Sequence, residues 1–200
     1  HDPARIFAHA QSEYWVGYAA MQRDDIETAR IAYDQYRNYG IQLAKLDPSN
    51  PAYLMEAGYG FQNVGSLDIL RNRSDATTSK QFEQAASYFS KAISLDVHNE
   101  QYRLDLSEAK AWLADSYAIR SMHGPALRAR AEQESILGQL LAKDPRNADY
   151  RQRVLLSQVA SAQIQMTSGQ LSQGTTLLRE LYHQADMAYA TDPNNAQHLQ

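Results

Sequence analysis

Cysteine is absent from the 200-residue sequence, which excludes disulfide bonds, thiolate metal ligands and a cysteine nucleophile. An excess of basic charge is also absent: the formal net charge is −4, whereas nucleic-acid-binding domains are typically basic. No apolar run approaches the roughly 18 residues of a membrane-spanning helix, and the chain does not start with a charged-then-apolar signal segment. We therefore expect no nucleic-acid partner and no membrane contact by this segment. The compartment, cytosol or periplasm, stays open.

Proline is scarce, and its distribution reveals an internal repeat. Five of the six prolines fall in copies of one recurring turn, which begins with Asp and, in four of its five copies, continues with Asn three residues later. The Asp residues are 45, 49, 48 and 48 positions apart, and such even spacing indicates a repeat architecture. The copies are LDPSNPAY at 46–53, LDVHNEQY at 95–102, KDPRNADY at 143–150, TDPNNAQH at 191–198 and a shorter HDPAR at 1–5.

The recurring turn predicts the end of one helix and the start of the next. Proline disfavours the α conformation in the residue before it, so a helix should end near the Asp. The Asn is a preferred N-cap, and Pro51 falls at the first helical position, where its missing N–H costs little. A tyrosine three residues after the Asn should pack the new helix against the previous one; the three are Tyr53, Tyr102 and Tyr150.

A weaker turn halfway through each unit divides it into a helix A and a helix B. Small residues recur in the A helices, and we expect each to face a small residue twelve positions later in helix B, with a bulky residue four beyond it. In repeat two the small and bulky residues of helix B are Ala85 and Phe89, which follow Gly65 by twenty and twenty-four positions. This longer separation predicts an eight-residue insertion around 71–80. In repeat three Arg130 stands where the pattern expects a bulky apolar residue. The remaining positions are Gly17, Gly65, Ala114 and Ala162 in helix A, and Ala29, Tyr33, Ala126, Gly174 and Leu178 in helix B.

These residues resemble the tetratricopeptide repeat family, best in DIETARIAY at 25–33 and GQLSQGTTLL at 169–178. The resemblance implies an all-α fold, a right-handed α-solenoid of about four stacked antiparallel helical hairpins. The period of 48–49 residues exceeds the usual 34 or so, and we attribute the difference to a longer helix B. We expect a single array of repeats at about 1–47, 48–96, 97–144 and 145–192, followed by the start of a further helix at 193–200. Since the chain opens inside a copy of the turn, we also expect it to be part of a larger protein.

The resemblance also implies that the A helices line a groove that holds a peptide or a partner protein. Counting three before, one after and four after each small residue gives the inward positions, although aromatic residues at this spacing also often pack between repeats. The expected partner-binding residues are Tyr14, Tyr18, Met21, Gln62, Ser66, Ile69, Asp115, Gln163 and Met166, with Ala111, Ala118 and Val159 completing the wall. The Lys, Asn and Arg pattern of a carboxylate clamp is missing from these positions.

No motif in the sequence indicates catalysis, so we expect no catalytic residue, no cofactor and no metal site. Glu180 and His183 have the spacing of a di-iron motif, but such a site needs a second copy and two further Glu. Gly58 and Gly60 lie in a predicted helix, not in a phosphate-binding turn. The sequence therefore favours a non-catalytic protein–protein interaction scaffold. The alternatives are self-association or a sensory or regulatory module of a larger bacterial protein and, more remotely, a helical-bundle metalloenzyme.

Overall fold

The computed structural model describes the backbone of residues 2–191 and the side chains of residues 2–183. This part of the chain contains eight α-helices and no strand. The turn at 192–198 and the further helix at 193–200 lie outside the described residues. The helices are α1 (Pro3–Met21), α2 (Ile26–Leu46), α3 (Pro51–Ile69), α4 (Ala76–Leu95), α5 (Glu100–Ile119), α6 (His123–Lys143), α7 (Ala148–Thr167) and α8 (Leu171–Thr191).

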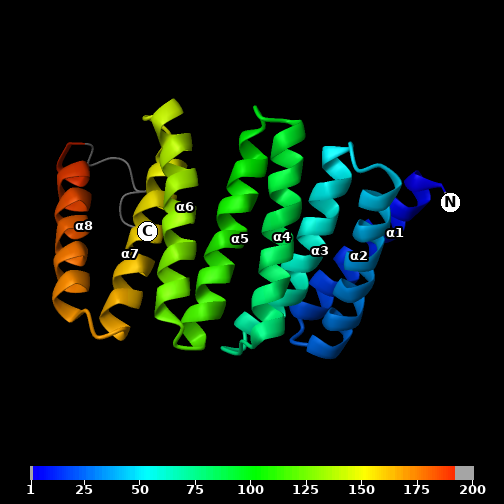
Figure 1. Cartoon of the computed structure of the whole chain (residues 1–200), viewed down its shortest axis with the longest axis horizontal. Coiled ribbons are helices and arrows are strands. Elements are labelled where there is room, and N and C mark those ends of the chain that lie inside the picture. Colours follow the sequence, from blue (N-terminus) through cyan, green and yellow to red (C-terminus); the bar gives the residue numbers. More distant parts are fainter. Residues whose placement is uncertain (1, 192–200) are drawn as a thin grey trace.

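The helices stand side by side along the long axis of the molecule, from α1 at one end to α8 at the other (Figure 1). Each helix packs chiefly against the one before it and the one after it in the chain. Because the connections are short, consecutive helices run antiparallel and form hairpins. The predicted all-α solenoid of stacked helical hairpins is confirmed. No single hairpin can bury its apolar side alone, so stacking supplies the core.

The turns between hairpins have the predicted stop and cap. Asp47, Asp96 and Asp144 are C-caps whose backbone N–H groups bond to carbonyls in the last turn of α2, α4 and α6. The Asn side chains then cap the next helices by accepting backbone N–H groups over 3.0–3.2 Å. The capping residues are Asn50 for α3, Asn99 for α5 and Asn147 for α7.

The opening HDPAR differs from the other copies of the turn. The Asp2 side chain accepts the N–H of Ala4 over 3.0 Å and caps α1, with Pro3 in the first turn. Asp2 therefore corresponds to Asn50, not to Asp47. Counted from the caps at 2, 50, 99 and 147, the spacings are 48, 49 and 48. The 45 residues between Asp2 and Asp47 are therefore not a repeat spacing, because HDPAR contains the cap and the proline but not the preceding stop.

The turns inside the hairpins share one backbone motif that the sequence analysis missed. Each has a left-handed residue at the same place in the repeat, and its N–H bonds to the carbonyl three residues back while the next N–H bonds five residues back. This Schellman pattern satisfies the free carbonyls of α1, α3, α5 and α7. Only the last position is glycine, although Asn and Asp also tolerate this conformation. The residues are Asp24 (φ 57°), Asn72 (φ 51°), Ser121 (φ 56°) and Gly169 (φ 89°).

The predicted eight-residue insertion in repeat two is wrong. The α3–α4 connection covers only residues 70–75, and α4 already begins at Ala76. Thr78 is buried at the place that Ala29 has in α2, and Phe82 lies against Gly65 as Tyr33 lies against Gly17. The sequence pattern was misleading because Ala85 and Phe89 follow Thr78 and Phe82 by seven residues, about two helical turns, and so lie on the same face.

The long period is shared by both helices of the hairpin. The A helices have 19, 19, 20 and 20 residues, and the B helices have 21, 20, 21 and 21. The attribution of the extra length to helix B alone was therefore wrong. At 1.5 Å per residue each helix is about 30 Å long, which gives both helices of every hairpin long faces for packing against their neighbours.

The core is built from small side chains with a few large rings between them. Phe82 and Phe89 of α4 are fully buried, and most of the other buried apolar residues are Ala or Leu. Three clusters of buried residues connect the hairpins, around Tyr33, Phe89 and Phe82. Tyr102 packs against the Phe89 cluster, and the hydroxyl of buried Tyr150 donates to Glu100 Oε2 over 2.9 Å. Tyr102 therefore packs onto the previous helix as predicted, while the hydrogen bond of Tyr150 reaches α5, two helices back. The packing of Tyr53 and Tyr150 on the helix directly before them stays a prediction.

Candidate interaction surface

An aromatic group on α1 is the most distinctive part of the predicted wall. Tyr14 stacks on Tyr18 with ring centroids 6.3 Å apart, and Trp15 meets both rings edge-on at 5.1 and 5.8 Å. Tyr14 also contacts Tyr33 and Tyr36 of α2, at 6.4 and 5.7 Å. Tyr14 thus belongs partly to the packing within the first hairpin, while Tyr18 (43% exposed) and Trp15 (60% exposed) face solvent.

The other predicted wall residues are spread along the array and mostly contact their own neighbours. The Gln62 amide donates to Glu108 Oε1 over 3.2 Å, and the Ser66 hydroxyl donates to the carbonyl of Asn63. Met21 packs in the first hairpin. Ile69 packs against the Phe82 cluster, and Met166 lies close to Gly174 in the last hairpin. All the wall positions are partly or largely accessible, and Tyr18 and Gln163 are the two exposed ones. Their role in partner binding stays a prediction.

Asp115 of the wall, which is partly accessible, is the outer end of a polar chain across three helices whose other members are buried. Its carboxylate pairs with Nη2 of Arg130 in α6. The Nη1 atom of the same arginine donates to Gln133 Oε1 over 2.7 Å. Ser157 of α7 donates to the same Gln133 oxygen over 3.0 Å. Burial raises the pKa of Asp115, while the Arg130 charge opposes that rise. Arg130 (6% exposed) takes the place that Tyr33 and Phe82 have in the first two hairpins, so an ion pair replaces an aromatic ring there.

A second polar feature is a row of two carboxylates, Glu56 and Asp105, at equivalent positions of α3 and α5. Glu56 Oε2 accepts the amide of Gln11 over 2.9 Å and the hydroxyl of Tyr36 over 2.8 Å. Asp105, 49 residues later, accepts the hydroxyl of Tyr59 over 2.7 Å and the amide of Gln101 over 3.0 Å.

In both cases a donor on one A helix reaches the acid on the next A helix. Burial raises the pKa of Glu56 and Asp105, although the hydrogen bonds lower it. The same acids raise the pKa of Tyr36 and Tyr59, after burial itself as the largest cause. Sequence reasoning missed this row, but acids one repeat apart, each preceded by a donor at 45–46 residues, were a usable signal.

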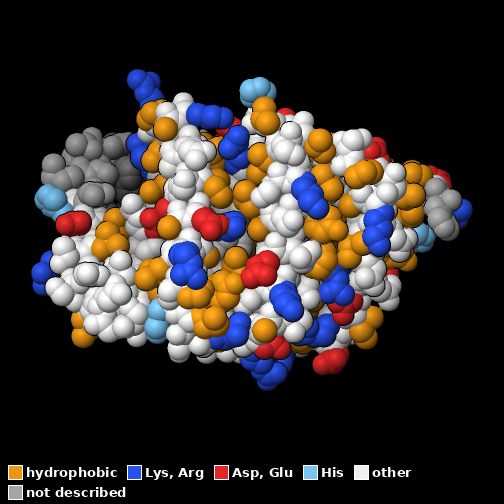
Figure 2. Space-filling model, viewed as in Figure 1, with side chains coloured by type: hydrophobic (Ala, Val, Ile, Leu, Met, Phe, Trp, Pro, Cys, Tyr) orange, Lys and Arg blue, Asp and Glu red, His pale blue; other side chains and the backbone are white. Residues whose placement is uncertain are grey.

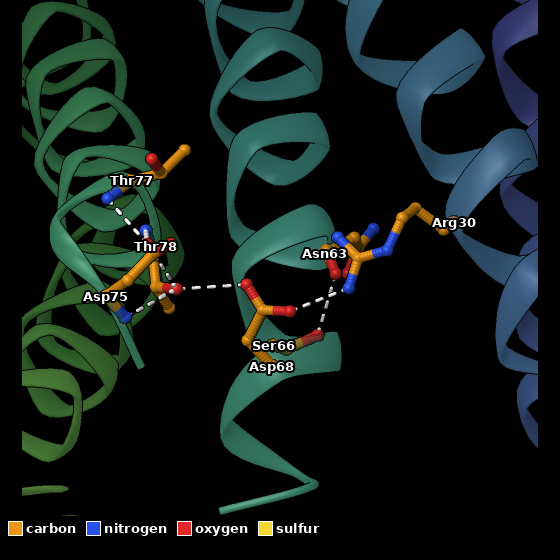
Figure 3. Close-up of polar contacts among 7 residues, drawn as sticks. All are labelled: Arg30, Asn63, Ser66, Asp68, Asp75, Thr77 and Thr78. Atoms are coloured by element: carbon orange, nitrogen blue, oxygen red, sulfur yellow. Dashed lines mark hydrogen bonds and ion pairs between the residues drawn. The ribbon is translucent and has the colours of Figure 1, made fainter. Parts of the chain in front are cut away.

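A third polar cluster connects the first two hairpins (Figure 3). Arg30 of α2 forms an ion pair with Asp68 Oδ1 of α3 over 2.6 Å, and the Thr78 hydroxyl of α4 donates to Asp68 Oδ2 over 2.9 Å. Thr78 is in turn fixed by the capping box that it forms with Asp75. A single carboxylate thereby joins three consecutive helices. This arrangement stabilises the stacking and leaves no free charge for a ligand at Asp68.

The surface between these clusters carries both signs of charge. Figure 2 shows one face of the array, where hydrophobic side chains lie among scattered Lys, Arg, Asp and Glu side chains. Within the described residues, no three His, Asp or Glu side chains gather closely enough to hold a metal ion. None of the described helices combines the length and the apolar character needed to cross a membrane.

The fold and the recurring junctions define the chain as an all-α solenoid of stacked helical hairpins. No protein-family model matches the sequence, and no curated protein matches it. A solved structure described as "MamA RS-1 ArsTM double mutant" is similar at 12% identity and a TM-score of 0.28, over 90% of this chain and 97% of that one.

Proposed function

We propose that the chain is a long-period member of the tetratricopeptide-like repeats and a non-catalytic scaffold that binds a peptide or a partner domain. The observation that carries this proposal is the wall of accessible A-helix residues, with an exposed aromatic group at one end. Solvent-exposed Tyr and Trp side chains are typical of interaction surfaces, because their rings bury a large area at a small entropic cost. A stacked array presents such side chains over a long surface.

The polar clusters support a scaffold in another way. Glu56, Asp105 and Asp68 are each held by donors from two other residues. Their hydrogen bonds hold neighbouring helices in register. A wall fixed in this way can present its accessible side chains in one arrangement, and such preorganisation lowers the entropic cost of binding.

The test uses the two exposed wall positions, which lie in the first and last hairpins. The chain is immobilised, and the proteins that it retains from solution are quantified by mass spectrometry. The set retained by the wild type is compared with the set retained by the Tyr18→Ala/Gln163→Ala variant. The matched control is Ile31→Ala, which removes another exposed apolar side chain, on α2. We expect a defined set of proteins to be retained by the wild type and the control.

That set should fall about tenfold or more with the double variant, because truncation of binding hot spots typically costs 2 kcal/mol or more. Unchanged unfolding midpoints would show that the variants fold. Equal retention by all three proteins would place the binding surface elsewhere and refute the proposal for this wall.

A further inference from the structure

Two hydrogen bonds that join the first three A helices occupy the same place in the repeat. The Gln11 amide of α1 donates to Glu56 of α3 over 2.9 Å. The Tyr59 hydroxyl of α3 donates to Asp105 of α5 over 2.7 Å. The two donors are 48 residues apart and the two acids are 49 apart, which matches the repeat period. We call each of these bonds an A-helix bridge.

The residues at the same place between α5 and α7 have the opposite polarity. Glu108 lies 49 residues after Tyr59, so an acid stands where the earlier bridges have a donor. Arg153 lies 48 residues after Asp105, so a donor stands where the earlier bridges have an acid. The helix caps of α3, α5 and α7 have the same spacings of 49 and 48. A carboxylate and a guanidinium can bond more strongly than the neutral donors of the earlier bridges do.

In the structure Glu108 and Arg153 have other partners. Glu108 Oε1 accepts the Gln62 amide over 3.2 Å and the indole N–H of Trp112 over 3.3 Å, both long for bonds to a carboxylate. Arg153 Nε donates to Asp149, one turn earlier in α7, over 2.8 Å. Such an ion pair within one exposed helix face is weak. Glu108 is exposed and the Arg153 side chain is 42% exposed, so both are free to exchange partners.

Arg153 already acts on the α5 face that carries Glu108. Burial raises the pKa of Asp105, and the Arg153 charge is one of the causes that oppose this rise. Asp105 precedes Glu108 by three residues, so the two acids are neighbours on the helix surface. The helices α5 and α7 also touch at their starts, where Tyr150 donates to Glu100 over 2.9 Å. This contact is a pivot about which the rest of α7 can approach α5.

The fourth hairpin lies outside the three clusters of buried apolar residues. Among the side chains described, up to residue 183, each cluster consists of residues from α1 to α6. The contacts between α6 and α7 include two hydrogen bonds, from Ser157 to Gln133 over 3.0 Å and from Ser161 to Glu134 over 2.6 Å. Breaking a hydrogen bond has a small net cost because water replaces the partner, whereas separating packed rings exposes apolar surface. This junction therefore allows the fourth hairpin to move.

We propose that the fourth hairpin closes toward the third and that Glu108 and Arg153 then form a third A-helix bridge. In this closed form Arg153 leaves Asp149, and the Glu108 carboxylate turns toward α7. Asp105 cannot serve as the partner in place of Glu108, because its two oxygens already accept from Tyr59 and Gln101. The exchange sets the width of the array between its last two described A helices. It concerns the array itself and does not depend on the proposed binding function.

Spin labels measure this closure directly, because the chain has no cysteine of its own. Ser121→Cys and Gln163→Cys place one label just after α5 and one in α7, both exposed and far from the pivot. Double electron–electron resonance then gives the distribution of distances between the labels. At low salt we expect two distances, the longer one for the arrangement in the structure and the shorter one for the closed form. At about 1 M salt, where charges are screened over about 3 Å, the shorter distance should disappear.

Four substitutions in the labelled chain test which side chains hold the closed form. Glu108→Ala and Arg153→Ala should each lower the ratio of the shorter to the longer distance about fivefold or more, since hydrogen bonds between charged groups are strong. Asp149→Asn should raise this ratio about twofold, because it removes the weak ion pair that competes for Arg153. The matched control is Arg151→Ala, which removes an exposed arginine two residues away and should leave the ratio unchanged. Circular dichroism checks that every variant folds.

Two outcomes would overturn the proposal. A single distance that is the same in the wild type, in Asp149→Asn and in Glu108→Ala would show that the last two hairpins do not close. A shorter distance that survives Glu108→Ala or Arg153→Ala unchanged would show that other groups hold the closed form. The partner-capture test does not measure this distance, so either result can fail without the other.

Discussion

Gly17 of α1 and Tyr33 of α2 are in such close contact that a Cβ atom on Gly17 would lie 2.5 Å from Cδ1 and Cε1 of the tyrosine ring. Real Cβ atoms do not come this close to other atoms, so the glycine is required by the ring. Burial also raises the pKa of Tyr33 to about 12. The same relationship recurs in the second hairpin between Gly65 and Phe82. This small-to-ring contact fixes how closely the two helices of a hairpin cross.

The first prediction is that Gly17→Ala destabilises the chain by about 1–3 kcal/mol, the usual cost of overpacking a well-packed core. Urea unfolding followed by circular dichroism measures the change. The matched control is Gly138→Ala in α6, where the added Cβ meets no atom within 4 Å apart from its chain neighbours and the nearby backbone of its own helix. This control should stabilise the chain by about 0.5–1 kcal/mol, because alanine is the better helix former. Stabilisation by both substitutions would contradict the close contact at Gly17.

The second prediction concerns the left-handed residues in the turns within the hairpins. Ser121 adopts φ 56° although a side chain disfavours that conformation. Ser121→Gly should therefore raise the free energy of unfolding by about 0.5–1 kcal/mol, and Gly169→Ala should lower it by about 1 kcal/mol. Thermal unfolding of the two variants beside the wild type measures both effects. Shifts of the same sign in both variants would show that these backbone conformations do not govern stability.

The third prediction follows from the raised pKa of Glu56, whose ordinary value is 4.5. When the pH rises above 4.5, the unfolded chain loses this proton first, so ionisation favours unfolding and the wild type loses stability. Glu56→Gln keeps an oxygen that can accept from Gln11 and Tyr36 but cannot ionise. The unfolding free energy of the wild type minus that of the variant should fall as the pH rises from 4 to 7. A difference that rises over this range would contradict the burial of the carboxylate.

The fourth prediction compares two ion pairs by double-mutant cycles. The coupling free energy between Arg130 and Asp115 should be about 1–2 kcal/mol, because the arginine is buried and hydrogen bonds to charged groups are strong. The exposed pair of Arg153 and Asp149, four residues apart on α7, should give about 0.3–0.5 kcal/mol. Raising the salt concentration should weaken the second coupling more than the first. Equal couplings would mean that Arg130 gains nothing from its burial.

The hairpin array could be predicted from the sequence because turns and caps are local. Asn50, Asn99 and Asn147 cap their helices as their residue types indicate. Contacts between helices were harder to predict from the sequence, because residues about two turns apart lie on the same helix face and fit the same pattern. Thr78 is the small residue of α4, yet Ala85, about two turns later, fits the same pattern better in sequence. Arg130 occupies the position of an aromatic ring only because the Asp115 carboxylate balances its charge. That pairing depends on how α5 and α6 pack.

The exposure of some predicted wall residues could be anticipated from the sequence, but their contacts could not, and their role in partner binding stays a prediction. Tyr18 and Gln163 are exposed as an accessible wall requires, whereas Tyr14 is half-buried against α2. The carboxylates of Glu56 and Asp105 escaped notice because acids one repeat apart look like ordinary surface charges until their donors on other helices are seen. The left-handed turn residues were missed for a similar reason, since Asp and Ser do not mark that conformation as glycine does.

The central claim is that consecutive hairpins stack in the register seen between α4 and α5, and the absence of cysteine allows a direct test. Ser79 and Ser116 have their hydroxyl oxygens 3.1 Å apart, so a Ser79→Cys/Ser116→Cys chain should form one intramolecular disulfide under mild oxidation. Mass spectrometry of peptides from the non-reduced protein identifies that bond. The control is Ser79→Cys/Ser107→Cys, whose second serine is also buried but bonds within its own helix. A disulfide in the first variant and none in the control is the predicted result; two free thiols in the first variant would contradict the stacking of the hairpins.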